Sequence, residues 1–193
     1  NQIQAVIQGI PNSGPGQPSG GTPTSLSLNF VGNVGELQTK DRQDFILLLT
    51  DGLPNCNPDN PYEGSNNDTC RCTINRCQGD YTRLGCLDKD ASVTAVNALG
   101  QKGIQTIVIG FGAETASGAG PETLNAMAQA GGFARKCTDE NPNACGAGDT
   151  CDPVTKLCGR AFYQAANQTE LSAALESIIN LVGSRDICLL ELA

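Results

Sequence analysis

Two short apolar runs constrain the fold of this chain more than any other feature of its sequence. Residues 44–50 (DFILLLT) hold five consecutive apolar residues between polar ones, and residues 104–111 (IQTIVIGF) form a second run that is rich in β-branched residues. Runs of this length are too short for a normal helix and are typical of parallel strands buried on both faces. We therefore expect both runs to be core strands, with a shorter strand over residues 161–165.

Helical patterns separate these strands. Helices are predicted over residues 87–102, ended by Gly103 in the left-handed conformation, and over residues 121–130. Asn167 and Glu170 form the capping pattern of a final helix before Gly183. We expect one face of that helix to carry Leu171, Leu175, Ile178, Ile179 and Val182.

The first part of the chain contains a further predicted helix. It is expected to begin at Thr22 and Pro23, a hydroxyl N-cap followed by a first-turn proline. Its apolar residues at near-helical spacing are Leu26, Phe30, Val34 and Leu37. Residues 1–10 have the apolar spacing of the last turns of a helix, and residues 11–21 read as a Pro/Gly/Ser-rich loop. Strands that alternate with helices predict an α/β fold, a Rossmann-like and mainly parallel sheet flanked by helices.

Ten cysteines lie outside the apolar runs. An even number of this kind favours disulfides in a non-cytosolic compartment. Zinc at Cys70, Cys72 and Cys77 is the weaker alternative, because the pattern lacks a clean pair of C-x-x-C units. The cysteines predict two disulfide-stapled insertions, and Cys188 is expected to pair with the fifth cysteine of the first insertion or with a residue outside this chain. The first insertion, residues 52–86, holds Cys56, Cys70, Cys72, Cys77 and Cys86, and the second, residues 137–158, holds Cys137, Cys145, Cys151 and Cys158.

Charge and composition exclude several classes of function. The chain has 20 acidic and 12 basic residues and a net charge of −8, which argues against binding to nucleic acid or to an anionic membrane. The absence of histidine removes His-dependent catalysis and most catalytic zinc sites, so we do not expect an enzyme. No apolar run approaches the roughly 20 residues of a transmembrane helix, so no transmembrane segment is expected.

Asp51 is the first candidate functional residue. It directly follows the most apolar strand, and ligands of open α/β sheets bind beyond the carboxyl ends of the strands. Gly52 allows a tight turn that leaves the carboxylate free. An aspartate in this place can equally be only the cap of the next turn.

Three motifs in order resemble the von Willebrand factor type A (VWA) domain: GGTPT at residues 20–24, TDG at residues 50–52 and GFG at residues 110–112. The resemblance covers nearly the whole chain apart from the two insertions. It implies a metal-ion-dependent adhesion site (MIDAS) at the top of the sheet, with Mg²⁺ or a similar ion (Mn²⁺ or Ca²⁺) held by Thr22 and Asp51, directly or through water. Hydroxyl and carboxylate oxygens suit such ions, and an open coordination position would accept a carboxylate from a partner protein.

The Asp-x-Ser-x-Ser triplet of the family does not occur in the 193 residues, nor do the strands that precede its threonine motif. Two interpretations stay open. The favoured one is that residues 1–193 are the C-terminal part of a VWA domain whose first strands are missing from this chain. The N-terminal half of that domain would have been cleaved or would belong to another chain. Residues 184–193 would then begin a following segment. The other is a degenerate relative without metal. Without the first strand, residues 45–49 should expose an unpaired apolar edge.

The first insertion begins beside the proposed metal. Its Asn57, Asp59, Glu63 and Asp68 are expected to rim the ligand-binding face, although a stapled surface loop would look the same. The expected function is a secreted, cell-surface or periplasmic adhesion module that binds an acidic group of a protein or matrix ligand, and the alternative is a structural scaffold without a working metal. The insertions and the LTDGLPNC stretch also resemble surface proteins of myxobacteria, including lipoproteins of gliding motility.

Overall fold

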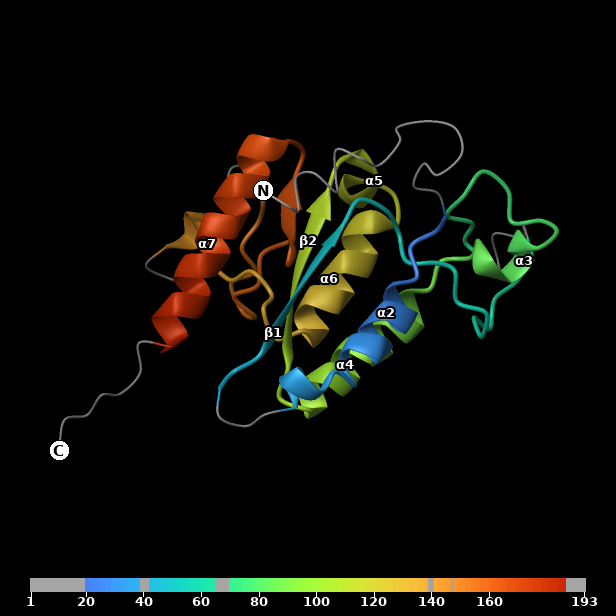
Figure 1. The fold of residues 1–193 in the computed structure, drawn as a ribbon. Helices are drawn as coiled ribbons and strands as arrows, with labels where there is room; N and C mark the ends of the chain where they lie inside the picture. Colours follow the sequence, from blue (N-terminus) through green and yellow to red (C-terminus); the bar gives the residue numbers. More distant parts are fainter. Residues whose placement is uncertain (1–19, 39–41, 65–69, 139–140, 147, 187–193) are drawn as a thin grey trace.

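A computed structural model describes residues 20–38, 42–64, 70–138, 141–146 and 148–186 (Figure 1). The segments 1–19 and 187–193, which include Cys188, lie outside the described residues, as does Asp68. The elements run in the order α2 (Thr24–Val31), η1 (Gly35–Leu37), β1 (Phe45–Thr50), α3 (Tyr81–Leu84), α4 (Lys89–Gln101), β2 (Gln105–Phe111), α5 (Ala113–Ala116), α6 (Gly120–Ala130), η2 (Pro142–Cys145), β3 (Tyr163–Ala165) and α7 (Gln168–Asp186).

The described strands form one parallel sheet in the order β1-β2-β3. β1 pairs with β2 from Phe45 opposite Gln105 to Thr50 opposite Gly110, and β3 pairs with the carboxyl half of β2. Both crossovers between strands contain helices, as parallel pairing requires. The predicted parallel α/β fold, with strands at the two apolar runs and a short third strand, is confirmed.

Helices cover both faces of the sheet (Figure 1). On one face α2, α4 and α6 pack over Ile46, Leu48 and Val108, and on the other α7 packs over Ile107 and Ile109. β2 lies between its two neighbours and is fully buried from Thr106 to Gly110. Because side chains alternate between the two faces along each strand, they contribute to two separate apolar clusters, one on each face.

β1 lies at an edge of the described sheet, and its second face is covered only at Phe45, whose ring packs against Phe133. Ile46 and Leu48 pack against the α2, α4 and α6 layer, whereas Leu47 and Leu49 are 46% and 51% exposed. The prediction that this strand is buried on both faces is therefore wrong for the described residues. The exposed apolar edge that the sequence led us to expect is present, because no described strand or helix covers these two leucines.

α2 is shorter than predicted. It begins at Thr24 with Pro23 as N-cap and no side-chain cap bond, and it ends at Val31, so Val34 and Leu37 lie beyond it. Leu28 is buried, whereas Leu26 and Phe30 are 42% and 75% exposed. The contact with α4 decides the buried face, since Leu28 packs with Leu99 in the same cluster.

The other helices agree closely with the expectations. Gly103 ends the α4 segment with φ +83°, and α6 begins one residue before the predicted start. The capping pair of α7 is present: Asn167 Oδ1 accepts the Glu170 backbone N–H at 3.0 Å, and Asn167 Nδ2 donates to Glu170 Oε1 at 2.9 Å. α7 continues past Gly183 to Asp186. Ile179 is 67% exposed and so does not share the buried face that was predicted for it.

Two pairs of disulfides hold the two insertions, as predicted. The first insertion contains Cys70–Cys86 and Cys72–Cys77, and the second contains Cys137–Cys151 and Cys145–Cys158. The expectation that Cys56 also forms a disulfide is wrong for the described residues, where it is a free, half-buried thiol. Disulfides at this density are typical of proteins from oxidising compartments.

Candidate functional site

The structure brings Thr22 and Asp51 into one cavity of about 490 Å³ at the carboxyl ends of β1 and β2. The segments that follow both strands line it, together with the segment before α2 and two parts of the first insertion. This is the position at which open parallel sheets bind ligands. The lining residues are Gly20, Gly21, Thr22, Asp51, Gly52, Leu53, Asn55, Thr73, Ile74, Phe111, Gly112, Ala113 and Glu114.

The turn after β1 exposes the Asp51 carboxylate. Thr50 Oγ1 donates to the Gly52 carbonyl at 2.8 Å and closes the turn, while the Asp51 side chain is exposed and accepts no hydrogen bond from a described residue. Gly52 has no side chain to fill the space that follows. A Cβ there would lie 3.1 Å from Thr22 Oγ1 and 3.8 Å from Glu114 Oε2. Gly52 therefore leaves open a space that a hydroxyl and a carboxylate border.

Backbone hydrogen bonds with Asn55 fix the position of Thr22, and its side chain does not cap α2. Its N–H donates to Asn55 Oδ1 at 2.6 Å, and its carbonyl accepts the Asn55 backbone N–H at 2.8 Å. The predicted role of Thr22 as the hydroxyl N-cap of α2 is wrong, because Pro23 is the N-cap and no side chain caps the helix. The Thr22 hydroxyl forms no hydrogen bond with a described residue, so it remains available to a ligand.

Glu114 completes the polar lining, and the sequence analysis missed it. It lies on α5 (Ala113–Ala116), two residues after Gly112, the N-cap of this helix, which has a φ of +82°. The backbone here is fixed by Gln164 of β3, which donates to the Gly112 carbonyl at 3.1 Å, and by the buried Thr115, which donates to the same carbonyl at 3.0 Å. The sequence did hold a signal for Glu114: it is an acidic residue shortly after β2, the strand that pairs with β1, which Asp51 follows.

The lining chemistry suits a hard divalent cation. Two carboxylates, Asp51 and Glu114, and one free hydroxyl, Thr22, face a cavity that no lysine or arginine lines. Neither carboxylate forms an ion pair with a described cationic side chain. Oxygen ligands with retained waters are those that Mg²⁺, Mn²⁺ and Ca²⁺ prefer.

Three of the four residues expected to rim the site are described, and none of them lines the cavity. Asn57 is only 7% exposed and donates to Asp88 Oδ1 at 2.8 Å, so its predicted place on an exposed rim is wrong. Asp59 is exposed and Glu63 pairs with Arg83, but neither lines the cavity. The insertion instead contributes Gly52, Leu53, Asn55, Thr73 and Ile74.

A cluster of cysteine sulfurs in the first insertion has a structural explanation. The Sγ atoms of Cys70, Cys77 and Cys86 lie within 4.8 Å of one another, because the two disulfides of this insertion pack together. The thiolate, not the disulfide sulfur, is the metal ligand. The zinc alternative therefore has no free thiolate here, since Cys56 is the free cysteine among the described residues.

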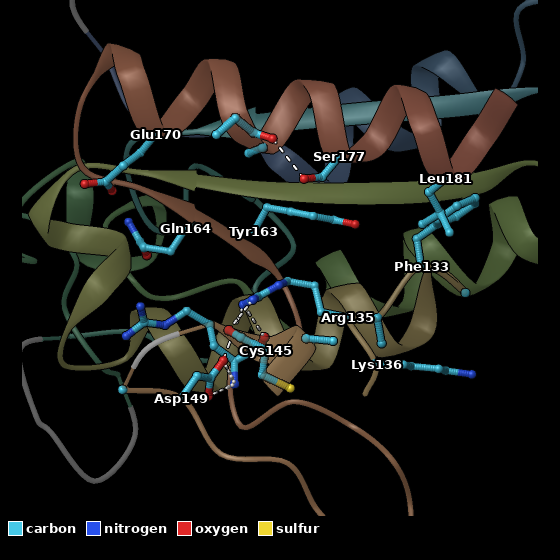
Figure 2. Close-up of a pocket in the computed structure, with 17 residues that line it drawn as sticks. Phe133, Arg135, Lys136, Cys145, Asp149, Tyr163, Gln164, Glu170, Ser177 and Leu181 are labelled. Carbon is cyan, nitrogen blue, oxygen red and sulfur yellow. Dashed lines mark hydrogen bonds and ion pairs between the residues drawn. The ribbon is translucent and has the colours of Figure 1, made fainter. Parts of the chain in front are cut away.

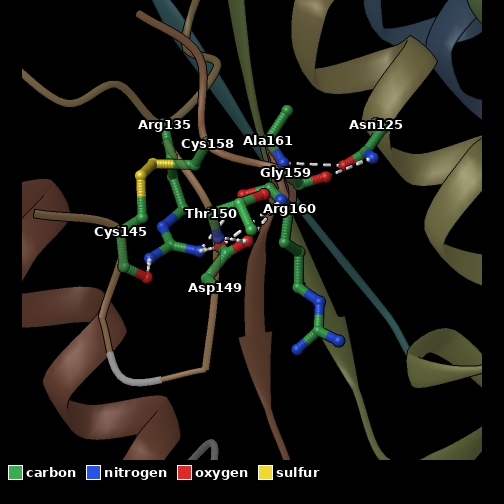
Figure 3. Close-up of polar contacts among 9 residues, drawn as sticks. All are labelled: Asn125, Arg135, Cys145, Asp149, Thr150, Cys158, Gly159, Arg160 and Ala161. Carbon is green, nitrogen blue, oxygen red and sulfur yellow. Dashed lines mark hydrogen bonds and ion pairs between the residues drawn. A yellow bond between two sulfur atoms is a disulfide. The ribbon is translucent and has the colours of Figure 1, made fainter. Parts of the chain in front are cut away.

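A second cavity of about 610 Å³ lies between α7, β3 and the second insertion (Figure 2). Two of its charged groups, Arg135 and Asp149, already bind one another. Arg135 donates to the carbonyls of Cys145 and Arg160 and pairs with Asp149 at 3.3 Å. Asp149 in turn accepts the backbone N–H groups of Thr150 and Arg160 (Figure 3). This network anchors the second insertion to the sheet, so we assign these contacts to folding rather than to ligand binding.

Comparison with protein-family models, with curated proteins and with solved structures finds no match for this chain. In the part of the chain that the structure describes, no helix has both the length and the apolar character to cross a membrane.

Proposed function

We propose that this chain is a cation-dependent binding module of the VWA type, in which Thr22 and Asp51 hold a divalent ion. One observation carries the proposal: the hydroxyl and the carboxylate, 29 positions apart in the sequence, line one cavity at the carboxyl ends of parallel strands. Two further features support it. Glu114 adds a second carboxylate, and Gly52 leaves space between the oxygens.

The sheet order also supports the proposal. A doubly wound sheet has the order 3-2-1-4-5-6, with its ligand site where the order reverses. The observed order β1-β2-β3, with Asp51 at the end of the edge strand, is what the second half of such a sheet would give. The half-exposed Leu47 and Leu49 would then be the surface that the first half covers.

The chemistry of the bound ion would be that of an electrostatic clamp. A Mg²⁺, Mn²⁺ or Ca²⁺ ion can accept a carboxylate oxygen from a partner in a coordination position that the protein leaves open. Thr22 and Asp51 would supply oxygen ligands, directly or through water, and Glu114 would supply further negative charge. The partner would be a protein or matrix component with an acidic group, met at a cell surface or outside the cell; the narrower likeness to myxobacterial gliding lipoproteins stays a prediction.

Mn²⁺ binding to purified variants tests this proposal. Asp51→Ala should abolish binding while leaving the circular dichroism spectrum unchanged, and Glu114→Gln should weaken binding about tenfold, since affinity follows the number of charged ligands. Asp59→Ala, an exposed acidic residue outside the cavity, is the matched control and should bind as the wild type does. Mn²⁺ affinity that survives Asp51→Ala would falsify the assignment. A wild-type chain that binds no Mn²⁺ would favour the scaffold function instead.

A further inference from the structure

The first insertion holds the segment that carries Thr22 through one buried asparagine. Asn55 is 4% exposed, and its Oδ1 accepts the Thr22 N–H at 2.6 Å while its own backbone N–H donates to the Thr22 carbonyl at 2.8 Å. Its Nδ2 donates to Thr73 Oγ1 at 2.8 Å, so all of its side-chain polar groups are engaged. Asn55 is thus the partner of the Thr22 N–H and shares the Thr22 carbonyl with the Thr24 N–H, which donates to it at 2.8 Å.

The approach of these two segments is too close for any residue but glycine at position 21. A Cβ on Gly21 would lie 2.1 Å from Asn55 Oδ1 and 2.2 Å from Cys56 Sγ. The next helix is attached less directly: Ser25 of α2 donates to Asp88, which lies just beyond the insertion and also accepts the Asn57 side chain. The loop that carries Thr22 is therefore bound directly to the insertion, and the first turn of α2 is linked to it through Asp88.

Thr73 links Asn55 to the disulfides. Thr73 Oγ1 and the Thr73 backbone N–H both donate to the Gly85 carbonyl, at 2.8 and 2.9 Å. Thr73 follows Cys72 and Gly85 precedes Cys86, and each of these cysteines belongs to one of the two disulfides that hold the insertion. A continuous set of contacts thus runs from the disulfides through Thr73 and Asn55 to Thr22.

We propose that Asn55 is a positioning residue for Thr22, and that through it the stapled insertion sets the cation affinity of the site. The inference rests on the proposed cation site. It gives the insertion a role that differs from the acidic rim, because Asn55 acts on the backbone of a ligand residue. The rival explanation is that Asn55 only stabilises the insertion, as any satisfied buried asparagine would.

Asn60 provides a matched control for the explanation that Asn55 only stabilises the insertion. It is a second buried asparagine of the same insertion, 1% exposed, and its Nδ2 donates to the carbonyls of Cys86 and Leu87. It does not line the cavity and does not contact Thr22. Asn55→Ala and Asn60→Ala each remove a buried amide from the insertion, but only the first removes the acceptor of the Thr22 N–H.

The experiment measures two quantities for both variants: Mn²⁺ affinity, and hydrogen exchange at the Thr22 amide without added cation. We expect Asn55→Ala to weaken Mn²⁺ binding about tenfold or more, as loss of a ligand's supporting partner does, and to remove the protection of the Thr22 amide. Asn60→Ala should resemble the wild type in both. Thr22→Ala combined with Asn55→Ala should bind no more weakly than Thr22→Ala alone, because both changes act on one ligand.

Equal effects of the two asparagine variants on affinity and exchange, or a Thr22 amide that stays protected in Asn55→Ala, would overturn the inference. If the wild type binds no Mn²⁺, the proposed cation site fails. Exchange at the Thr22 amide then still decides whether Asn55 positions this loop, so the two failures can be told apart.

Discussion

Replacing Gly21 by alanine tests the close approach on which the Thr22 loop depends. The new Cβ would lie 2.1 Å from Asn55 Oδ1 and 2.2 Å from Cys56 Sγ. Asn55 cannot move away without cost, because it is buried and its side chain binds both Thr22 and Thr73. The substitution must therefore displace either the loop or the asparagine.

The expected loss follows from these contacts. Forcing an extra carbon into a packed site and leaving the Thr22 N–H without its acceptor should together lower the free energy of unfolding by about 2–4 kcal/mol. For a chain of 193 residues this corresponds to a fall in Tm of about 5–15 °C. Urea unfolding followed by circular dichroism measures the free energy, and differential scanning calorimetry measures Tm.

Gly35→Ala is the control for this substitution. A Cβ at Gly35 has no atom within 4 Å, so the change should alter stability by less than about 0.5 kcal/mol. If Gly21→Ala were as mild as Gly35→Ala, the reasoning that Asn55 and the Thr22 loop interlock at this glycine would be refuted.

Three further substitutions test other parts of the structure. Leu47→Lys should change the stability of this chain by less than about 0.5 kcal/mol, because the side chain is 46% exposed; a large loss in urea unfolding would contradict the open edge of β1. Arg135→Ala should cost about 2–3 kcal/mol by the same assay, since two carbonyls and a carboxylate lose their donor, and an unchanged midpoint would argue against its anchoring role. Lys89 holds the pKa of Glu122 below its ordinary value by a hydrogen bond and by its charge, so Lys89→Ala should raise that pKa in an NMR titration. Because the pKa is lowered in the folded state, the pair stabilises the fold above the ordinary glutamate pKa, and this contribution disappears as the pH falls through the lowered value. Alkylation without reduction should label Cys56 ahead of the eight paired cysteines, and labelling of any of those would contradict the disulfide map.

The elements that the sequence predicted well are those with local causes. Five adjacent apolar residues in β1 cannot form an amphipathic helix, and Gly103 ends α4 through its own backbone conformation. The Asn167 and Glu170 cap depends only on residues three positions apart. The placement of Asp51 follows in the same way, because it directly succeeds the strand.

The features that the sequence did not predict depend on contacts between distant segments. The buried face of α2 is decided by α4, so near-helical spacing alone selected the exposed Phe30. Glu114 reaches the cavity only because β1 and β2 pair in register, which no single segment encodes. Asn55 resembled an ordinary loop asparagine, and only the fold shows that it binds Thr22.

Paramagnetic NMR with Mn²⁺ tests the central claim, a divalent cation held between the loops after β1 and β2, most directly. At substoichiometric Mn²⁺ the backbone amides of Thr22, Gly52 and Gly112 should broaden first, because these residues line the same cavity. Added Mg²⁺ should reverse the broadening. Broadening that begins instead near Asp59 and Glu63, or that spreads evenly over the exposed carboxylates, would contradict the claim.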